Sequence, residues 1–231
     1  MSDSTAAGVA KARHLESLAL ESARIVDDPY AQYFYTGATL VSLMGHRAGV
    51  WLFDWMMPGI YDMLIARTKT IDELLRAEAP SVQQVVILGA GYDMRGFRLH
   101  HEGLQIFEVD QPAVQARKKA KVAQIPNLPS ASVHYVPVDF SCQLVDEELR
   151  KVPSFDPKAA SLIIFEGVTQ YIPREAVAST IKAMDSISGE GSTFFMSYVD
   201  EQVQTPEKVV GAGYANPQKL QQIISYAAKL G

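Results

Sequence analysis

The sequence predicts a doubly wound α/β fold, in which a mainly parallel sheet carries helices on both faces and a helical segment precedes it. Two observations lead to this prediction. After Pro80, short β-branched runs alternate with helical patterns, which is the order of elements in parallel βαβ units. Before Pro80, apolar residues recur at helical spacing and no strand-like run occurs. We therefore expect a helical lid or substrate-binding region over residues 1–80 and a sheet-containing core over residues 81–231.

Length, charge and hydropathy restrict the class of protein. The chain has 231 residues, of which 48% are hydrophobic and 20% charged, so it can bury one substantial core. The net charge of −5 argues against a nucleic-acid partner, which usually needs a basic face. The apolar stretch 50–57 is too short to cross a bilayer, and the first residues lack the apolar segment of a secretory signal. The single cysteine, Cys142, fits a reducing compartment. We expect a cytoplasmic protein without a membrane partner, a nucleic-acid partner or a metal site.

The front of the chain is predicted to be helical on both sides of a turn. Residues 10–24 carry apolar side chains at helical spacing. Residues 27–29 predict a turn, and Pro29 suits the first turn of the next helix. A later helix includes residues 70–75 and ends before Pro80.

Five strands and three helices are predicted after Pro80. The strand candidates are short and rich in β-branched residues, as expected for strands buried on both faces. They are residues 84–88, 105–110, 132–138, 160–166 and 192–199. The helix candidates are residues 112–123, 146–151 and 174–187. In open sheets of this kind, ligands bind at the carboxyl ends of the strands, beside the point where the strand order reverses.

Two glycines, Gly89 and Gly91, flank Ala90 directly after the first strand, where the pattern predicts the start of a helix. Glycines there let the backbone turn tightly and approach a ligand closely. The fingerprint of nicotinamide dinucleotides requires a third glycine three residues after the second, and that position is Met94. The glycines favour a ligand site, although an ordinary tight turn also accounts for them.

Acidic residues follow three other strands: Asp110 after the second, Asp139 after the third and Glu166 after the fourth. An acidic residue about 20 positions past the glycines can accept hydrogen bonds from the ribose hydroxyls of a nucleoside. Several carboxylates at one sheet edge suit an adenine amino group, ribose hydroxyls and an α-amino group, and they repel a pyrophosphate. This charge pattern favours S-adenosylmethionine over a dinucleotide, with a set of unrelated surface acids as the alternative.

At the glycine turn and at the acidic strand ends described above, the chain resembles the leucine carboxyl methyltransferase family in its broad sense. This family includes tetracenomycin-type polyketide carboxyl O-methyltransferases. The matching stretches are residues 66–72, 84–95, 107–112, 138–140 and 165–173, together with residues 5–6 and 28–31 near the front. They span nearly the whole chain, and their combination in this order is specific. The resemblance implies a Rossmann-like class I methyltransferase fold and S-adenosyl-L-methionine as the cofactor.

The resemblance also implies how the amino-acid end of the cofactor is held. Arg67 would pair with the cofactor's carboxylate, and Glu166 would approach the same end of the molecule. Gly89, Ala90 and Gly91 would form the turn beneath the cofactor.

The remaining implied roles concern the nucleoside and the methyl group. Asp110 would hold the ribose, while Asp139 and Phe140 would flank the adenine by polar contact and packing. Tyr171 would lie near the methyl donor and the acceptor, as the candidate catalytic residue.

The chain departs from the family in its C-terminal part. Family members usually continue for several tens of residues past a Gly-Glu-Pro segment, and their sheet has seven strands against the five predicted here. The fifth predicted strand, residues 192–199, would then be an uncovered apolar edge, and edges of that kind pair with other chains. We therefore expect either a truncated chain or one completed by a homo-oligomer or a partner chain at this edge.

The acceptor is expected to be an O-nucleophile. A carboxylate is already nucleophilic at neutral pH, whereas a phenol or alcohol needs a general base. No histidine stands in a matching stretch, which favours the carboxylate of a small polyketide-like molecule or of a protein C-terminus. The histidines are His14, His46, His100, His101 and His134. Aromatic side chains of the front could cover an apolar acceptor, or could equally pack the helices onto the sheet. They are Tyr30, Tyr33, Phe34, Tyr35, Trp51, Phe53 and Trp55.

Two other functions stay open. A nicotinamide-dependent oxidoreductase would need the third glycine and a tyrosine–lysine pair at short helical spacing, and neither is visible. A methyltransferase fold that acts as a binding or regulatory subunit without turnover is the non-enzymatic alternative.

Overall fold

The fold is built around one parallel sheet of five strands. The computed structural model describes residues 3–99, 101–140 and 142–199. The strand order is β3-β2-β1-β4-β5, and every neighbouring pair is parallel. The strands are β1 Gln84–Leu88, β2 Gln105–Asp110, β3 Val133–Pro137, β4 Ser161–Phe165 and β5 Thr193–Met196. All five predicted strands are confirmed, and so is the doubly wound α/β class.

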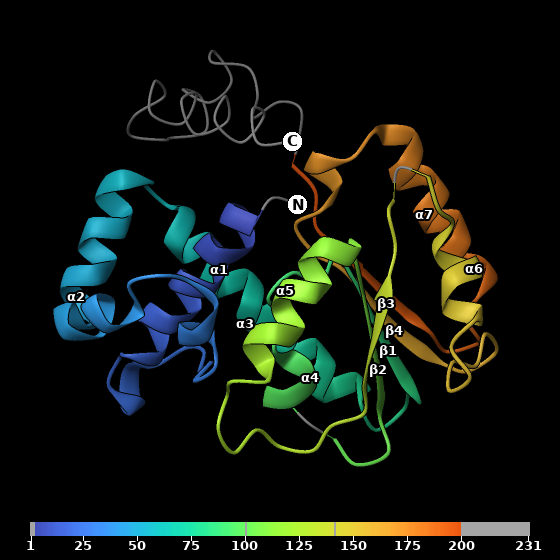
Figure 1. Cartoon of the computed structure of the whole chain (residues 1–231), viewed down its shortest axis with the longest axis horizontal. Helices are drawn as coiled ribbons and strands as arrows, with labels where there is room; N and C mark the ends of the chain where they lie inside the picture. The colour runs from blue at the N-terminus through green and yellow to red at the C-terminus, as the bar shows by residue number, and fades with distance from the viewer. Residues whose placement is uncertain (1–2, 100, 141, 200–231) are drawn as a thin grey trace.

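Helices cover both faces of the sheet, as Figure 1 shows. On one face lie α3 (Ile60–Glu78), α4 (Arg95–Arg98) and α5 (Pro112–Val122), and on the other lie α6 (Val145–Arg150) and α7 (Arg174–Ser186). The three helices predicted after the second, third and fourth strands are confirmed within two residues at each end. The helix predicted after the glycine turn is one short turn, α4.

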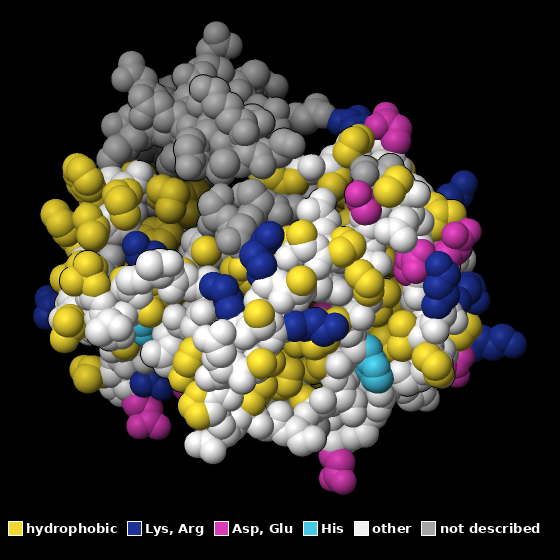
Figure 2. Space-filling view, viewed as in Figure 1, with side chains coloured by type: hydrophobic (Ala, Val, Ile, Leu, Met, Phe, Trp, Pro, Cys, Tyr) yellow, Lys and Arg dark blue, Asp and Glu magenta, His cyan; other side chains and the backbone are white. Residues whose placement is uncertain are grey.

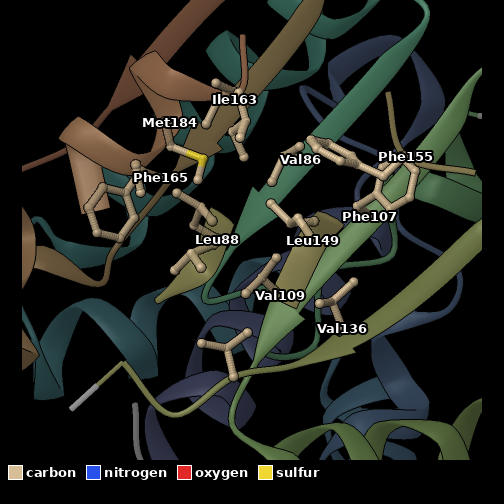
Figure 3. Close-up of a cluster of buried hydrophobic side chains, with 14 of the residues drawn as sticks. Val86, Leu88, Phe107, Val109, Val136, Leu149, Phe155, Ile163, Phe165 and Met184 are labelled. Atoms are coloured by element: carbon tan, nitrogen blue, oxygen red, sulfur yellow. The ribbon is translucent and has the colours of Figure 1, made fainter. Parts of the chain in front are cut away.

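The larger core lies between the sheet and the pair α6 and α7 (Figure 3). Alternate residues of the strands, such as Val86, Phe107 and Ile163, point into it and meet Leu149 and Met184 from these two helices. The other sheet face packs against α3 through a second apolar cluster. Because β1 and β4 are buried along their whole length, their sequences are continuous apolar runs rather than alternating ones.

The N-terminal helix does not span the predicted residues 10–24. Instead α1 comprises Asp3–Ser17 and is followed by a short 3₁₀ turn, Glu21–Ala23. Side chains at its end fold the chain back: Ser17 Oγ accepts the Asp28 N–H at 2.7 Å, and Glu16 Oε1 accepts the Ile25 N–H at 2.7 Å. These bonds hold residues 25–28 against the end of α1, so the chain turns back instead of continuing as a helix.

The segment after Pro29 and the next helix also differ from a continuous helical pattern. A 3₁₀ turn, Ala31–Phe34, follows Pro29 in place of an α-helix. Helix α2, Ala38–Met56, is kinked at Gly45, where φ is +76°. Hydrophobic side chains gather on the outer surface of α2, with Trp51 68% and Trp55 61% exposed (Figure 2). Among the described residues, no helix has the length and apolar character needed to cross a membrane.

The strand order fixes where a ligand can bind. The chain runs from β1 outward to β2 and β3, and then returns to place β4 on the other side of β1. The order therefore reverses between β1 and β4, so a crevice forms outside their carboxyl ends. Gly89 follows β1 and Glu166 follows β4, which puts both predicted site residues at this point.

Candidate active site

A cavity of about 410 Å³ lies at the carboxyl ends of β1 and β4. Its lining has two parts of different chemistry. The strand-end part is polar and includes Gly89, Ala90, Asp93, Glu166 and Gly167, with Arg67 from α3. The helical part is apolar and is formed by α1, α2 and α3, whose lining residues include Ala6, Val9, Phe53, Met57 and Met63. The cavity thus joins a charged site at the sheet to an apolar chamber under the N-terminal helices.

The turn after β1 requires glycine at position 89. Its φ is +65°, and a Cβ atom there would lie 2.2 Å from Cγ2 of Val168, which follows β4. The side chain of Val168 therefore packs against the backbone of Gly89 in the space that any other residue's Cβ atom would fill. This contact brings the glycine turn and Glu166 to the same cavity.

Arg67 and Glu166 form an ion pair within the cavity lining. Arg67 Nε donates to Glu166 Oε1 at 2.6 Å, and the side chains are 18% and 12% exposed. In the part of the chain that the structure describes, neither Nη nitrogen of Arg67 has a hydrogen-bond partner. The pair therefore presents a guanidinium with free donors next to a carboxylate with unused lone pairs. Such a pair matches the ammonium and carboxylate of an amino acid.

A second arginine, Arg95, holds the other oxygen of Glu166. Arg95 is 2% exposed and contacts three carboxylates, those of Asp72 at 2.8 Å, Asp93 at 2.5 Å and Glu166 at 2.9 Å. Burial alone would raise the pKa of Asp93, but the charges of Arg95, Arg13 and Lys118 outweigh burial and hold this pKa at about 2. The carboxylate of Asp93, which lines the cavity, is therefore ionised at neutral pH.

Asp110 stabilises the glycine turn directly. Its Oδ2 accepts the Gly91 N–H at 2.6 Å, and its Oδ1 accepts the Gln111 N–H at 2.7 Å. Burial raises the pKa of Asp110, while these two N–H donors oppose the rise. Neither Asp110 nor Gly91 is among the residues that line the cavity. Each carboxylate oxygen keeps a second lone pair, so the predicted contact with a ribose stays a prediction.

A buried lysine connects the β1 loop to β2. Lys118 of α5 donates to the carbonyl of Asp93 and to Oε2 of Glu108, and both its side chain and that of Glu108 are almost fully buried. Burial raises the pKa of Glu108 to about 7, although Lys118 acts in the opposite direction. The loop that carries Gly89 is thus tied to β2 from both sides, by Asp110 and by Lys118.

Of the two residues predicted to flank an adenine, Phe140 lines a second hollow and Asp139 does not. Phe140 lines a hollow of about 430 Å³ between the loop after β3 and the start of α7, together with Cys142 and Ala176. The backbone N–H of Asp139 donates to the side chain of Gln143 at 2.9 Å. Tyr171, in the 3₁₀ turn Thr169–Tyr171 after β4, lines the first cavity.

The aromatic residues of the front divide between two roles. Phe53 lines the cavity, whereas Phe34 stacks on Tyr92 at 4.9 Å between ring centroids and Tyr35 bonds to His14. Trp51 and Trp55 face outward. Most of these side chains therefore pack the helices or point away from the cavity.

None of the four described histidines lines the cavity, and His100 lies outside the described residues. His14 bonds to the hydroxyls of Tyr35 and Ser42, and His134 bonds to Gln105. Burial lowers the pKa of His14, which favours its neutral form. Within residues 3–99, 101–140 and 142–199, the cavity offers no histidine base.

The structure brings five of the predicted residues to one cavity, namely Arg67, Gly89, Ala90, Glu166 and Tyr171. Sequence reasoning assigned no role to Arg13, Asp93 or Arg95. Asp93 and Arg95 follow closely after the glycine turn. Two opposite charges two positions apart, next to a predicted ligand-binding turn, could have indicated a role for both residues. Arg13, whose Nη2 donates to the Tyr92 carbonyl at 2.6 Å, offered no such signal because it comes from a distant helix.

Comparison with known proteins places this site in a family. The sequence profile of the leucine carboxyl methyltransferase family matches residues 6–185. The chain is 32% identical over 228 residues to a Mycobacterium tuberculosis protein named "Putative S-adenosyl-L-methionine-dependent methyltransferase", a match that covers 94% of this chain and 68% of the relative. A protein of the same name from Saccharopolyspora erythraea is 33% identical over 193 residues, which are 81% of this chain and 64% of that relative.

A solved structure supports the fold. The crystal structure of a "putative methyltransferase" from Thermobifida fusca superposes with a TM-score of 0.52 at 19% identity, covering 94% of this chain and 72% of that one. The profile match gives no support for a nicotinamide-dependent oxidoreductase. The chain belongs to the leucine carboxyl methyltransferase family of S-adenosylmethionine-dependent enzymes.

Proposed function

We propose that this chain transfers a methyl group from S-adenosylmethionine to a carboxylate oxygen of a small, mainly apolar acid. The Arg67–Glu166 pair in the cavity at the strand reversal carries this proposal. When bound, the cofactor supplies an electrophilic methyl group on a sulfonium, and transfer to the acceptor oxygen leaves a methyl ester and S-adenosylhomocysteine.

The charged part of the cavity suits the amino-acid end of this cofactor. The Nη donors of Arg67 would hold its carboxylate, and the lone pairs that Glu166 does not use would accept from its ammonium. The positive φ of Gly89 turns the backbone away beneath the ligand, and Ala90 adds only a methyl group. A cluster that already balances its own charges binds a zwitterion without leaving a net charge buried.

The nucleoside end would extend from the glycine turn toward the loop after β3. Asp110 would receive the ribose hydroxyls at the tip of β2, while Asp139 and Phe140 would receive the adenine. The hollow lined by Phe140 supports this direction. The placement is a proposal that rests on the order of the loops along the sheet edge.

The apolar part of the cavity supports a small acceptor with a hydrophobic body. Phe53, Met57 and Met63 lie on its helical side, and methionine side chains adapt to ligands of irregular shape. The charged residue that α1 adds to the cavity lining, Arg13, is already paired with Asp28 at 2.8 Å, so it is not free to hold a long polar peptide. We therefore favour a polyketide-like acid over a protein C-terminus, which stays the second acceptor class to test.

The chain's own residues would hold the acceptor rather than deprotonate it. A carboxylate needs no general base, and the described cavity lining contains no histidine. The hydroxyl of Tyr171 would donate to the acceptor carboxylate and fix its orientation toward the methyl carbon. Orientation and exclusion of water by α1 and α2 would then provide most of the acceleration.

A base-release assay tests the reaction. The full 231-residue chain would be incubated with methyl-labelled S-adenosylmethionine and either aromatic and polyketide-like acids or peptides that end in leucine. Mild base hydrolyses methyl esters to methanol but leaves methyl ethers and N-methyl groups intact. We expect base-labile label with an apolar acid. Base-stable label would contradict the carboxylate assignment, and a chain that binds the cofactor but methylates nothing in either set would favour the regulatory-subunit alternative.

A further inference from the structure

A continuous chain of ion pairs runs from helix α1 to the cavity. It contains four arginines and four carboxylates, which are Arg13, Arg67, Arg95, Arg98, Asp28, Asp72, Asp93 and Glu166. Successive members lie between 2.5 and 4.0 Å apart, and most of the side chains are less than a tenth exposed. Equal numbers of opposite charges make the cluster neutral when every member is ionised.

Arg95 occupies the branching position of this cluster. Its Nε donates to Asp72, while its Nη1 donates both to Asp93 and to Glu166. Asp93 and Glu166 line the cavity, and Arg95 itself does not. Arg95 would therefore not touch a ligand itself, and the side chains that connect it to the cavity are these two carboxylates.

Removal of Arg95 would leave three carboxylates facing one another without their shared cation. Like charges that share one buried site favour protonation of one of the groups, and they favour rotation of the side chains away from each other. Glu166 would retain Arg67 on Oε1 but would lose the donor that fixes Oε2. Asp93 would retain the more distant charges of Arg13 and Lys118.

We propose that Arg95 is a positioning residue that holds Asp93 and Glu166 in the orientation in which the cavity can receive the ammonium group of its ligand. This inference rests on the proposed binding of S-adenosylmethionine. It assigns to Arg95 a role beyond stabilising the fold, because the two carboxylates that it orients belong to the cavity wall.

Arg98 supplies a matched control within the same cluster. Its side chain is 7% exposed and pairs with Asp72 at 2.6 Å, yet it contacts neither Asp93 nor Glu166. Arg95→Met and Arg98→Met each remove one buried guanidinium from the cluster. If the arginines only stabilised the fold, both variants would lower the unfolding temperature and neither would change ligand affinity selectively.

The test compares S-adenosylmethionine affinity of the folded full-length variants by calorimetry between pH 5.5 and 8. We expect Arg95→Met to weaken binding about 10- to 100-fold, with a greater loss at the acid end, because a carboxylate that becomes protonated no longer attracts the ammonium. Arg95→Lys should recover part of the affinity, and Arg98→Met should stay within about twofold of the wild type. Equal affinity and equal pH dependence in Arg95→Met and the wild type would overturn the inference.

A ligand-free measurement separates this inference from the proposed function. Carboxyl-carbon NMR follows the titration of Asp93, whose pKa Arg95 holds low. A higher Asp93 pKa in Arg95→Met, with no change in Arg98→Met, supports the positioning role even if the wild-type chain fails to bind S-adenosylmethionine. An unchanged Asp93 titration in Arg95→Met overturns the role whether or not the cofactor binds.

Discussion

Arg67 Nε and Glu166 Oε1 lie 2.6 Å apart, although 99 positions separate the two residues along the chain. Helix α3 delivers Arg67 to the sheet edge, and the loop after β4 delivers Glu166. The contact exists because the N-terminal helices pack against the carboxyl ends of the strands. It brings a guanidinium from the helical region and a carboxylate from the sheet region together at one cavity.

Neutralising Glu166 should therefore weaken cofactor binding. Glu166→Gln keeps the shape of the side chain but removes the charge that pairs with Arg67 and with the ligand ammonium. We expect S-adenosylmethionine affinity to fall by roughly 1.5–3 kcal/mol, the usual range for a hydrogen bond to a charged group. Calorimetry measures this loss of affinity. The control is Glu73→Gln, on the exposed side of α3. An affinity loss as large in Glu73→Gln would contradict the assignment.

Gly89→Ala should reduce both stability and binding. The added Cβ atom would lie 2.2 Å from Val168 Cγ2, and the backbone would stay at a positive φ. We expect a loss of roughly 2 kcal/mol or more in the free energy of unfolding, from backbone strain of about 1 kcal/mol together with the clash. Urea denaturation measures this loss.

Gly103→Ala isolates the strain from the clash. Gly103 also has a positive φ, +82°, but a Cβ atom there would meet nothing within 4 Å. Gly103→Ala should lower the free energy of unfolding only by the backbone strain, about 1 kcal/mol. If the two variants were equally stable, close approach of the β1 and β4 loops would not be what requires glycine at position 89.

Tyr171→Phe should affect turnover more than cofactor binding. The phenol lines the cavity and is proposed to hold the acceptor, so its loss should lower kcat about tenfold, as expected for one hydrogen bond to a charged group. Cofactor affinity should change less than about twofold. Tyr135→Phe is a suitable control, because the Tyr135 hydroxyl is buried in β3, away from the cavity. A parallel loss of cofactor affinity in Tyr171→Phe would move this residue to the cofactor site.

Glu108 should make stability depend on pH near neutrality. Its pKa in the folded chain is raised to about 7, from an ordinary value of 4.5, chiefly because the side chain is buried. A raised folded-state pKa contributes stability below the unfolded pKa, and this contribution is lost as pH rises to the folded value. We expect unfolding free energy to decline between about pH 4.5 and 7 by at most roughly 3 kcal/mol.

Denaturation of Glu108→Gln across the same pH range tests the source of the decline. The variant lacks the titrating carboxyl, so its stability should vary less over this interval than that of the wild type. The readout is the change of stability with pH and not the absolute stability of the variant, because Lys118 loses its paired carboxylate at every pH. A decline of equal size in both proteins would exclude Glu108 as its cause.

The fold was predictable because its signals are local. Buried β-branched runs such as residues 84–88 stand between turn residues and helical patterns, and their order alone implies a parallel sheet. The helix predicted over residues 10–24 is confirmed for residues 10–17 and was wrong for residues 18–24, where the chain turns back and Ser17 and Glu16 accept backbone N–H groups of residues that follow. Those bonds form only because the chain reverses direction after α1, and the spacing of apolar residues does not predict this reversal.

From the residue pattern alone, the site was predictable only where it follows a strand end, whereas Arg67 of α3 was expected from the family resemblance. Gly89 and Glu166 stand directly after buried strands, so their meeting at the reversal of strand order followed from topology. The hydrogen bond from Arg13 to the Tyr92 carbonyl could not be predicted, because it depends on how α1 packs against the loop after β1. The expected partner at the β5 edge stays a prediction; Phe194 of β5 is 39% exposed.

The most direct test of the account is calorimetric titration of S-adenosylmethionine into the full 231-residue chain, with NADH as the competing ligand and Asp110→Ala as the variant. The account predicts a dissociation constant of about 1–100 μM for S-adenosylmethionine, a large loss of affinity in Asp110→Ala, and no binding of NADH. A chain that circular dichroism shows to be folded, and that binds NADH but not S-adenosylmethionine, would contradict it.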